Sequence, residues 1–239
     1  MTSLPNSLEE AITQAQQATQ AAIADGLTRL QVELNFPELK PLPVAQQFVG
    51  AFEDMGTELR VFFADPGSAA LARRDWGDKP YSLRGIGELK AVIQPEEKLF
   101  LFVAPSSIEV EKVEELCTEA GDRPCVLLNP RLEDVATIGI GYAGRRLRDR
   151  FLSTIESCYF MRPLDGAVVY RAYPSPWQVW VERENGFEMV SETPQKPVGD
   201  DLDRILMRAN GVDPDAPSLV APRRGILSSL QDFLRALSQ

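Results

Sequence analysis

Short apolar segments alternate with segments of helical periodicity along the first half of the chain, and this alternation limits the folds open to the sequence. The segments 59–64, 99–103 and 125–128 are almost entirely apolar, with only Arg60 interrupting the first. Strands that are apolar on both faces are typical of a parallel sheet covered by helices on both sides. The sequence therefore predicts a three-layer α/β fold with a mostly parallel, Rossmann-like sheet. The helices expected around these strands lie near 7–24, 44–55, 68–75 and 107–120.

Residues 27–36 have a different pattern, because apolar and polar side chains alternate strictly along them. Such alternation is typical of a strand with one face in water. We therefore expect this strand near an edge of the sheet. Residues 76–97 are mixed in character and are expected to be rich in loops.

The pattern changes after about residue 157, where several short strand-like segments follow one another and Asn185-Gly186 indicates a hairpin. We expect an antiparallel extension over 157–193, either added to the sheet edge or folded as a small lobe. One domain over 1–211 is then followed by a proline-containing linker at 212–224 and an amphipathic helix at 225–239.

Composition excludes several classes of function. The chain has a formal net charge of −10, which disfavours general nucleic-acid binding. It contains no histidine, so nucleophile–histidine catalysis and most catalytic zinc sites are excluded. Its three cysteines lack metal-binding spacing and are expected to be buried thiols. We predict neither catalytic nor metal-binding residues, and we favour a protein that is not an enzyme.

A glycine-spaced segment, 139–144, precedes four arginines in an otherwise acidic chain. Glycines at such a turn let backbone N–H groups approach an anion at a helix N-terminus, and arginine binds carboxylate and phosphate through two hydrogen bonds. A phosphate-containing ligand is one interpretation, and a structural turn with arginines paired to the chain's own carboxylates is the other. The candidate anion site comprises Asn129, Gly139, Gly141, Gly144, Arg145 and Arg146.

Two surfaces are candidates for binding a protein partner. One is the remainder of the arginine helix, and the other is the apolar stripe of the C-terminal helix, which instead could pack on its own domain. Their candidate contact residues are Arg148, Arg150, Leu230, Phe233, Leu234 and Leu237.

The first residues, MTSLPNSLEE, have neither a basic start nor an apolar core, and no apolar run reaches membrane-spanning length. We expect a cytoplasmic protein that associates with a membrane at most peripherally.

Several motifs together resemble one uncharacterised family of cyanobacterial and chloroplast proteins. They are Leu128-Asn129-Pro130, Gly139-Ile140-Gly141, Arg145–Phe151, Tyr159–Leu164 and Tyr173-Pro174-x-Pro176-Trp177. The resemblance covers most of 8–210. One plant branch of that family is associated with accumulation and assembly of photosystem II, and another is fused to a chloroplast adenylate kinase.

The resemblance implies a photosynthetic context, and it supplies no catalytic residues. We therefore expect a non-catalytic binding or assembly factor near thylakoid membranes. The alternatives are a phosphate- or nucleotide-binding enzyme or regulator that uses the Gly139–Arg146 turn, and a structural domain that oligomerises through its C-terminal helix.

Overall fold

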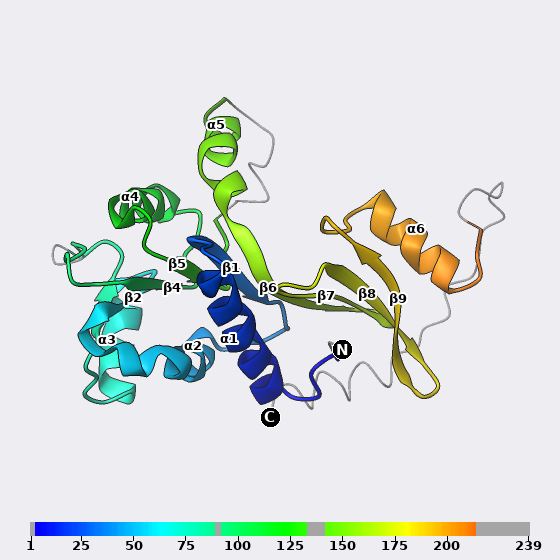
Figure 1. Ribbon diagram of the computed structural model, residues 1–239, viewed down its shortest axis with the longest axis horizontal. Coiled ribbons are helices and arrows are strands. Elements are labelled where there is room, and N and C mark those ends of the chain that lie inside the picture. Colours follow the sequence, from blue (N-terminus) through cyan, green and yellow to red (C-terminus); the bar gives the residue numbers. More distant parts are fainter. Residues whose placement is uncertain (1–2, 89–91, 133–141, 214–239) are drawn as a thin grey trace.

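The computed structural model describes residues 3–88, 92–132 and 142–213, and these form one nine-stranded sheet with helices on both faces (Figure 1). The strands are β1 (Arg29–Leu34), β2 (Leu59–Phe63), β3 (Ser82–Gly85), β4 (Leu99–Val103), β5 (Cys125–Leu128), β6 (Glu156–Leu164), β7 (Ala167–Ala172), β8 (Trp177–Arg183) and β9 (Gly186–Thr193). The helices are α1 (Leu8–Ala24), α2 (Pro41–Val49), α3 (Pro66–Asp75), α4 (Val110–Ala120), α5 (Tyr142–Arg150) and α6 (Asp200–Ala209), with 3₁₀ helices η1 (Gly50–Glu58) and η2 (Leu152–Thr154).

The sheet order is β3-β2-β4-β5-β1-β6-β7-β8-β9. The first six strands in this order pair in parallel, and β6 to β9 pair antiparallel as successive hairpins. This confirms the α/β class and the mostly parallel sheet. The antiparallel extension continues the same sheet through β6 and does not form a separate lobe.

The position expected for residues 27–36 is wrong, because β1 is a central strand bonded to β5 on one side and β6 on the other. Its apolar side chains Leu30, Val32 and Leu34 are buried in the main core. Gln31 and Glu33 point to the opposite face and line a pocket, whereas Arg29 donates hydrogen bonds to the Cys117 and Gly121 carbonyls at the end of α4. The alternation of apolar and polar residues therefore indicates a strand with a partly uncovered face, and not a strand at the edge of the sheet.

The described part of 76–97 is rich in loops as expected, and it also contains the edge strand β3, whose four residues pair in parallel with β2.

Figure 1 shows α1, α2 and α3 on one side of the sheet and α4, α5 and α6 on the other. The first side holds the largest apolar cluster, built around β1, β2 and β4. The second side has two smaller clusters, one under α4 and α5 and one between Phe160, Val169 and Trp177. The second side is thus covered in two patches, and the gap between them lies over β1 and β6.

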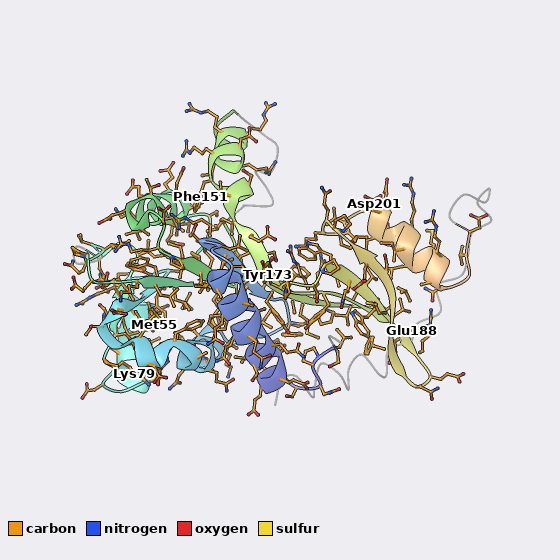
Figure 2. All side chains as sticks on the ribbon, in the orientation of Figure 1. Met55, Lys79, Phe151, Tyr173, Glu188 and Asp201 are labelled. Carbon is orange, nitrogen blue, oxygen red and sulfur yellow. The ribbon has the colours of Figure 1, made fainter. Side chains whose placement is uncertain are left out.

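Local hydrogen bonds explain where several elements begin and how they are tied together. Asp65 caps α3 by accepting a hydrogen bond from the Ser68 backbone N–H at 2.9 Å. Tyr173, labelled in Figure 2, donates its hydroxyl hydrogen to Asp25 just after α1 at 2.8 Å. All three cysteines are buried and free, as expected for structural thiols.

Candidate functional site

A pocket of about 600 Å³ opens on the sheet face opposite α1, over the centre of β1. Four parts of the chain supply its walls: β1, the residues that follow β5, the α5–η2 region, and the segment between β9 and α6. The lining residues are Gln31, Glu33, Pro130, Arg131, Leu132, Arg148, Leu152, Ser153, Ile155 and Lys196.

Sheet topology accounts for the pocket's location. Strands β5 and β6 flank β1, so the connection from β5 to β6 must cross β1 on one face. Leu132 at the start of that connection and Arg148 and Leu152 near its end all line the pocket. Because α6 covers only the outer antiparallel strands, the polar side of β1 between these elements stays accessible.

Positive charge predominates in the pocket. Among the described lining residues, Arg131, Arg148 and Lys196 are the cations and come from three different segments, and Glu33 is the carboxylate. Arg148 is half-buried on the last turn of α5, and Arg131 is exposed at the pocket's margin. Guanidinium groups suit carboxylate and phosphate because they donate two parallel hydrogen bonds. The arrangement is chemically suited to an anion.

Lys196 and Glu33 meet inside this pocket. Their Nζ and Oε2 atoms are 4.0 Å apart, and their side chains are 37% and 17% exposed. The Lys196 ammonium also lies 3.8 Å from the ring centroid of Phe160 and 5.4 Å from that of Trp177. The contacts with the two aromatic rings hold the Lys196 ammonium over the sheet.

Burial alters the pKa of both groups in this pair. Desolvation raises the pKa of the Glu33 carboxyl, and Lys196 and Asn35 oppose that shift only in part. Desolvation also lowers the pKa of the Lys196 amine, and the nearby Arg162 charge adds to this while Glu33 opposes it. Both side chains therefore adopt their neutral forms more readily in this pocket than in water.

Beside Gln31 and Ser153, the uncharged part of the described lining is apolar. Leu132 is buried in the cluster under α4 and α5, and Leu152 and Ile155 pack against that cluster. These side chains give the pocket an apolar wall next to its cations. A ligand that satisfies both surfaces would join an anionic group to an apolar part.

The arginines predicted from the sequence have three different environments. Arg148, which the sequence makes a candidate for contact with a protein partner, lines the pocket. Arg150 pairs with Glu114 of α4 through bonds of 2.6 and 2.8 Å, which is the internal ion pair that the sequence left open. Arg145 and Arg146 lie exposed on α5 and do not line the pocket. In Figure 2, side chains at the outer end of α5 extend into solvent.

Asn129 has a structural role at the end of β5. Its Oδ1 accepts a hydrogen bond from the Leu34 backbone N–H at 2.7 Å, and its own N–H donates to the Val32 carbonyl at 2.7 Å. Its φ of 48° is a conformation that asparagine tolerates better than most residues. The side chain thus ties the ends of β5 and β1 together.

The remaining predicted residues divide between α5 and parts of the chain outside the described residues. Gly144 belongs to the first turn of α5. Gly139 and Gly141 lie outside the described residues, as do Leu230, Phe233, Leu234 and Leu237 of the expected C-terminal helix. The glycine turn and the C-terminal helix therefore stay predictions.

Sequence reasoning missed Gln31, Glu33 and Lys196 as members of a site. Gln31 and Glu33 did have a signal, since they are the polar side chains of a strand within a predicted parallel sheet. Lys196 had none, because only the chain path after β9 brings it to β1. Its segment is anchored by the buried Pro197 and by a 2.8 Å bond from the Thr193 hydroxyl to the Gln195 carbonyl.

Within residues 3–88, 92–132 and 142–213, no cluster of three cysteine or carboxylate side chains is arranged to hold a metal ion. In the same part of the chain, no helix has the length and apolar character needed to cross a bilayer.

A family model described as Domain of unknown function (DUF1995) matches residues 5–204. The match includes every described strand and every residue that lines the pocket. No solved structure matches the chain.

Proposed function

We propose, for a chain that belongs to the DUF1995 family of domains of unknown function, that its central pocket binds a small anionic ligand with an apolar part. The observation that supports this most directly is the convergence of Arg131, Arg148 and Lys196 on one pocket of about 600 Å³. Among the described lining residues, these three cations and one carboxylate, Glu33, lie next to an apolar wall.

The overall charge of the protein makes this convergence informative. A chain with a net charge of −10 repels anions at long range, so anion binding needs a local excess of positive charge. Elsewhere, several basic side chains are paired with carboxylates, as in Arg150 with Glu114 and Lys79 with Glu53. In the pocket, three cations from separate segments line one cavity of about 600 Å³.

The test is a panel of phosphates, phosphate esters and carboxylates, read by thermal shift and by calorimetry on the full chain. A ligand at 100 times its Kd should stabilise the protein by about 2.7 kcal/mol. Arg148→Gln should weaken binding by roughly tenfold or more, the loss of one charge-assisted contact. Arg145→Gln is the matched control, since it removes an arginine from the same helix outside the pocket.

An equal loss in Arg145→Gln would instead favour the site expected at the Gly139–Arg146 turn. Absence of binding across the whole panel would contradict the proposal. A cooperative melt of each variant excludes loss of folding as the cause.

A second proposal concerns a protein partner in a photosynthetic context, near thylakoid membranes. The exposed arginines Arg145 and Arg146 on α5 favour it, because they form a basic surface on an acidic protein and lie within the motifs that resemble the photosystem II-related family. An acidic partner surface fits this chemistry.

The test is deletion of the gene in a photosynthetic host, with photosystem II content as the measurement, followed by complementation. Wild-type chain should restore the content and Arg145→Glu with Arg146→Glu should not. Full restoration by the charge-reversed chain would contradict a role for this surface.

A further inference from the structure

We propose that Lys196 is a nucleophile that captures an anionic aldehyde or ketone as an imine inside the pocket. This deepens the proposed function and rests on it, because the same arginines would hold the anionic group of the carbonyl compound. The geometry that supports it is the meeting of an amine, a carboxyl group and two guanidinium groups around one pocket.

Lys196 differs in its surroundings from the other lysines whose contacts are described. Its Nζ lies over the Phe160 ring, inside a pocket large enough for a substrate, and it faces Glu33 at 4.0 Å. Lys79, Lys98 and Lys112 instead make closer ion pairs of 2.5–2.8 Å with carboxylates that do not line this pocket. Lys196 therefore combines access to a cavity with the weakest ionic pairing of the four.

Burial, and not the surrounding charge, favours the neutral form of Lys196. Burial lowers the pKa of the amine and Arg162 of β6 adds to this, while Glu33 of β1 and the Phe160 ring favour the ammonium. Arg171 of β7 lies over the other aromatic ring, Trp177, at 5.3 Å and is itself paired with Glu156. Desolvation of a lysine in a pocket with apolar walls is an established way to obtain a nucleophilic amine.

The covalent step balances without an oxidant or reductant. The Lys196 Nζ lone pair attacks the carbonyl carbon, a C–N bond forms, and the carbonyl π pair moves to oxygen. The nitrogen gives up one proton and the oxygen takes one up, which gives a carbinolamine. The hydroxyl group takes up a second proton and leaves as water while the nitrogen lone pair forms the C=N bond, and loss of the last N–H proton leaves the neutral imine. Glu33 is placed to take up and return these protons through one water molecule, because its carboxyl oxygen lies 4.0 Å from Nζ and burial raises its pKa.

The experiment uses pyridoxal 5′-phosphate as an aldehyde probe and pyridoxine 5′-phosphate as its matched alcohol, with the full chain near neutral pH. Borohydride reduces any imine to a stable secondary amine, and peptide mapping by mass spectrometry locates it among the six lysines of the chain. Because burial lowers the pKa of the Lys196 amine and the pocket holds the aldehyde beside it, we expect more label on Lys196 than on each other lysine.

Lys196→Arg should abolish the dominant adduct and keep the positive charge, so pyridoxine 5′-phosphate should still bind. Lys112→Arg, at an exposed lysine, is the control and should leave the Lys196 adduct unchanged. Pyridoxine 5′-phosphate should also protect Lys196 from labelling.

Two negative outcomes separate the two proposals. If pyridoxine 5′-phosphate binds but label spreads over exposed lysines, the imine proposal is overturned and anion binding stands. If neither compound binds and labelling follows exposure alone, the imine proposal fails, and the wider anion panel then decides the proposed function.

Discussion

At the residue scale, two buried carboxylates show how surroundings decide the effect of a charge. Glu97 is 4% exposed and bonds Arg60, 7% exposed, at 2.5 Å, and it also accepts a 2.8 Å bond from the Gln94 backbone. Glu33 has a lysine only at 4.0 Å. The charge of Glu97 is fully compensated by its partners, whereas the charge of Glu33 is only partly compensated. We therefore expect loss of the charge to destabilise the protein at Glu97 and to stabilise it at Glu33.

Glu97→Gln should destabilise the protein by about 3 kcal/mol, because it removes the carboxylate charge that compensates the buried Arg60 guanidinium. For a chain of this size that corresponds to a Tm lower by roughly 6–12 °C, measured by calorimetry. Lys98→Gln is the control, since it breaks an exposed ion pair with Glu58 and should cost less than about 1 kcal/mol. Equal effects of the two substitutions would contradict the role assigned to the buried pair.

Glu33→Gln should change how stability depends on pH. The pKa of Glu33 is raised in the folded state, so its contribution to stability is full below the ordinary glutamate pKa and is lost as pH rises through the folded value. The variant has no such group and should therefore gain stability relative to wild type between acidic and neutral pH. Urea denaturation across that range measures the difference. A difference that is constant with pH would show that Glu33 titrates as in water.

At the element scale, β1 determines both the sheet and the pocket. It is bonded on both sides, its apolar face packs on α1, and its polar face forms the pocket wall. By contrast, β3 and β9 are the outer strands of the sheet. Strands with partners on both sides should be the most protected from local opening.

Hydrogen exchange should therefore be slow for the amides of β1, as slow as for β4 and slower than for β3. The physical reason is that each of β1 and β4 lies between two strands, while β3 has one described neighbour. Exchange followed by mass spectrometry on peptides that cover residues 29–34, 82–85 and 99–103 measures this. Exchange from β1 at the rate of β3 would contradict its central position.

At the scale of the whole molecule, truncation can test how the described core relates to the predicted C-terminal helix. The three apolar clusters of the described residues draw on residues between Leu4 and Leu202. The α6 helix ends at Ala209 and lies on the outer antiparallel strands. The region after Gly211 is thus a suitable place to test whether domain and tail are separable.

A chain that ends at Gly211 should keep a cooperative melt within a few degrees of the full chain. It should lose any self-association or partner binding that depends on the predicted helix 225–239, as measured by light scattering and pull-down. The six large apolar residues of that helix would each contribute roughly 1.5–3 kcal/mol if fully buried in the domain. A melt lowered by many degrees, with association unchanged, would show that the helix belongs to the core.

The sequence by itself determined the fold class and most elements, because the period and two-sided apolar character of a segment are local properties. Segments 59–64, 99–103 and 125–128 correspond to buried strands for this reason. The order of strands is not a local property. The polar face of residues 27–36 fits an edge strand and a central strand beside a pocket equally well.

Only the tertiary structure decided which charges share a site. Arg148 and Arg150 are two residues apart on α5, yet one lines the pocket and the other pairs with Glu114 of α4. Lys196 reaches Glu33 because the sheet places the end of β9, α6 and the β5–β6 crossover around one exposed face of β1. Such contacts join residues far apart in the chain, and they depend on strand order, which local periodicity does not contain.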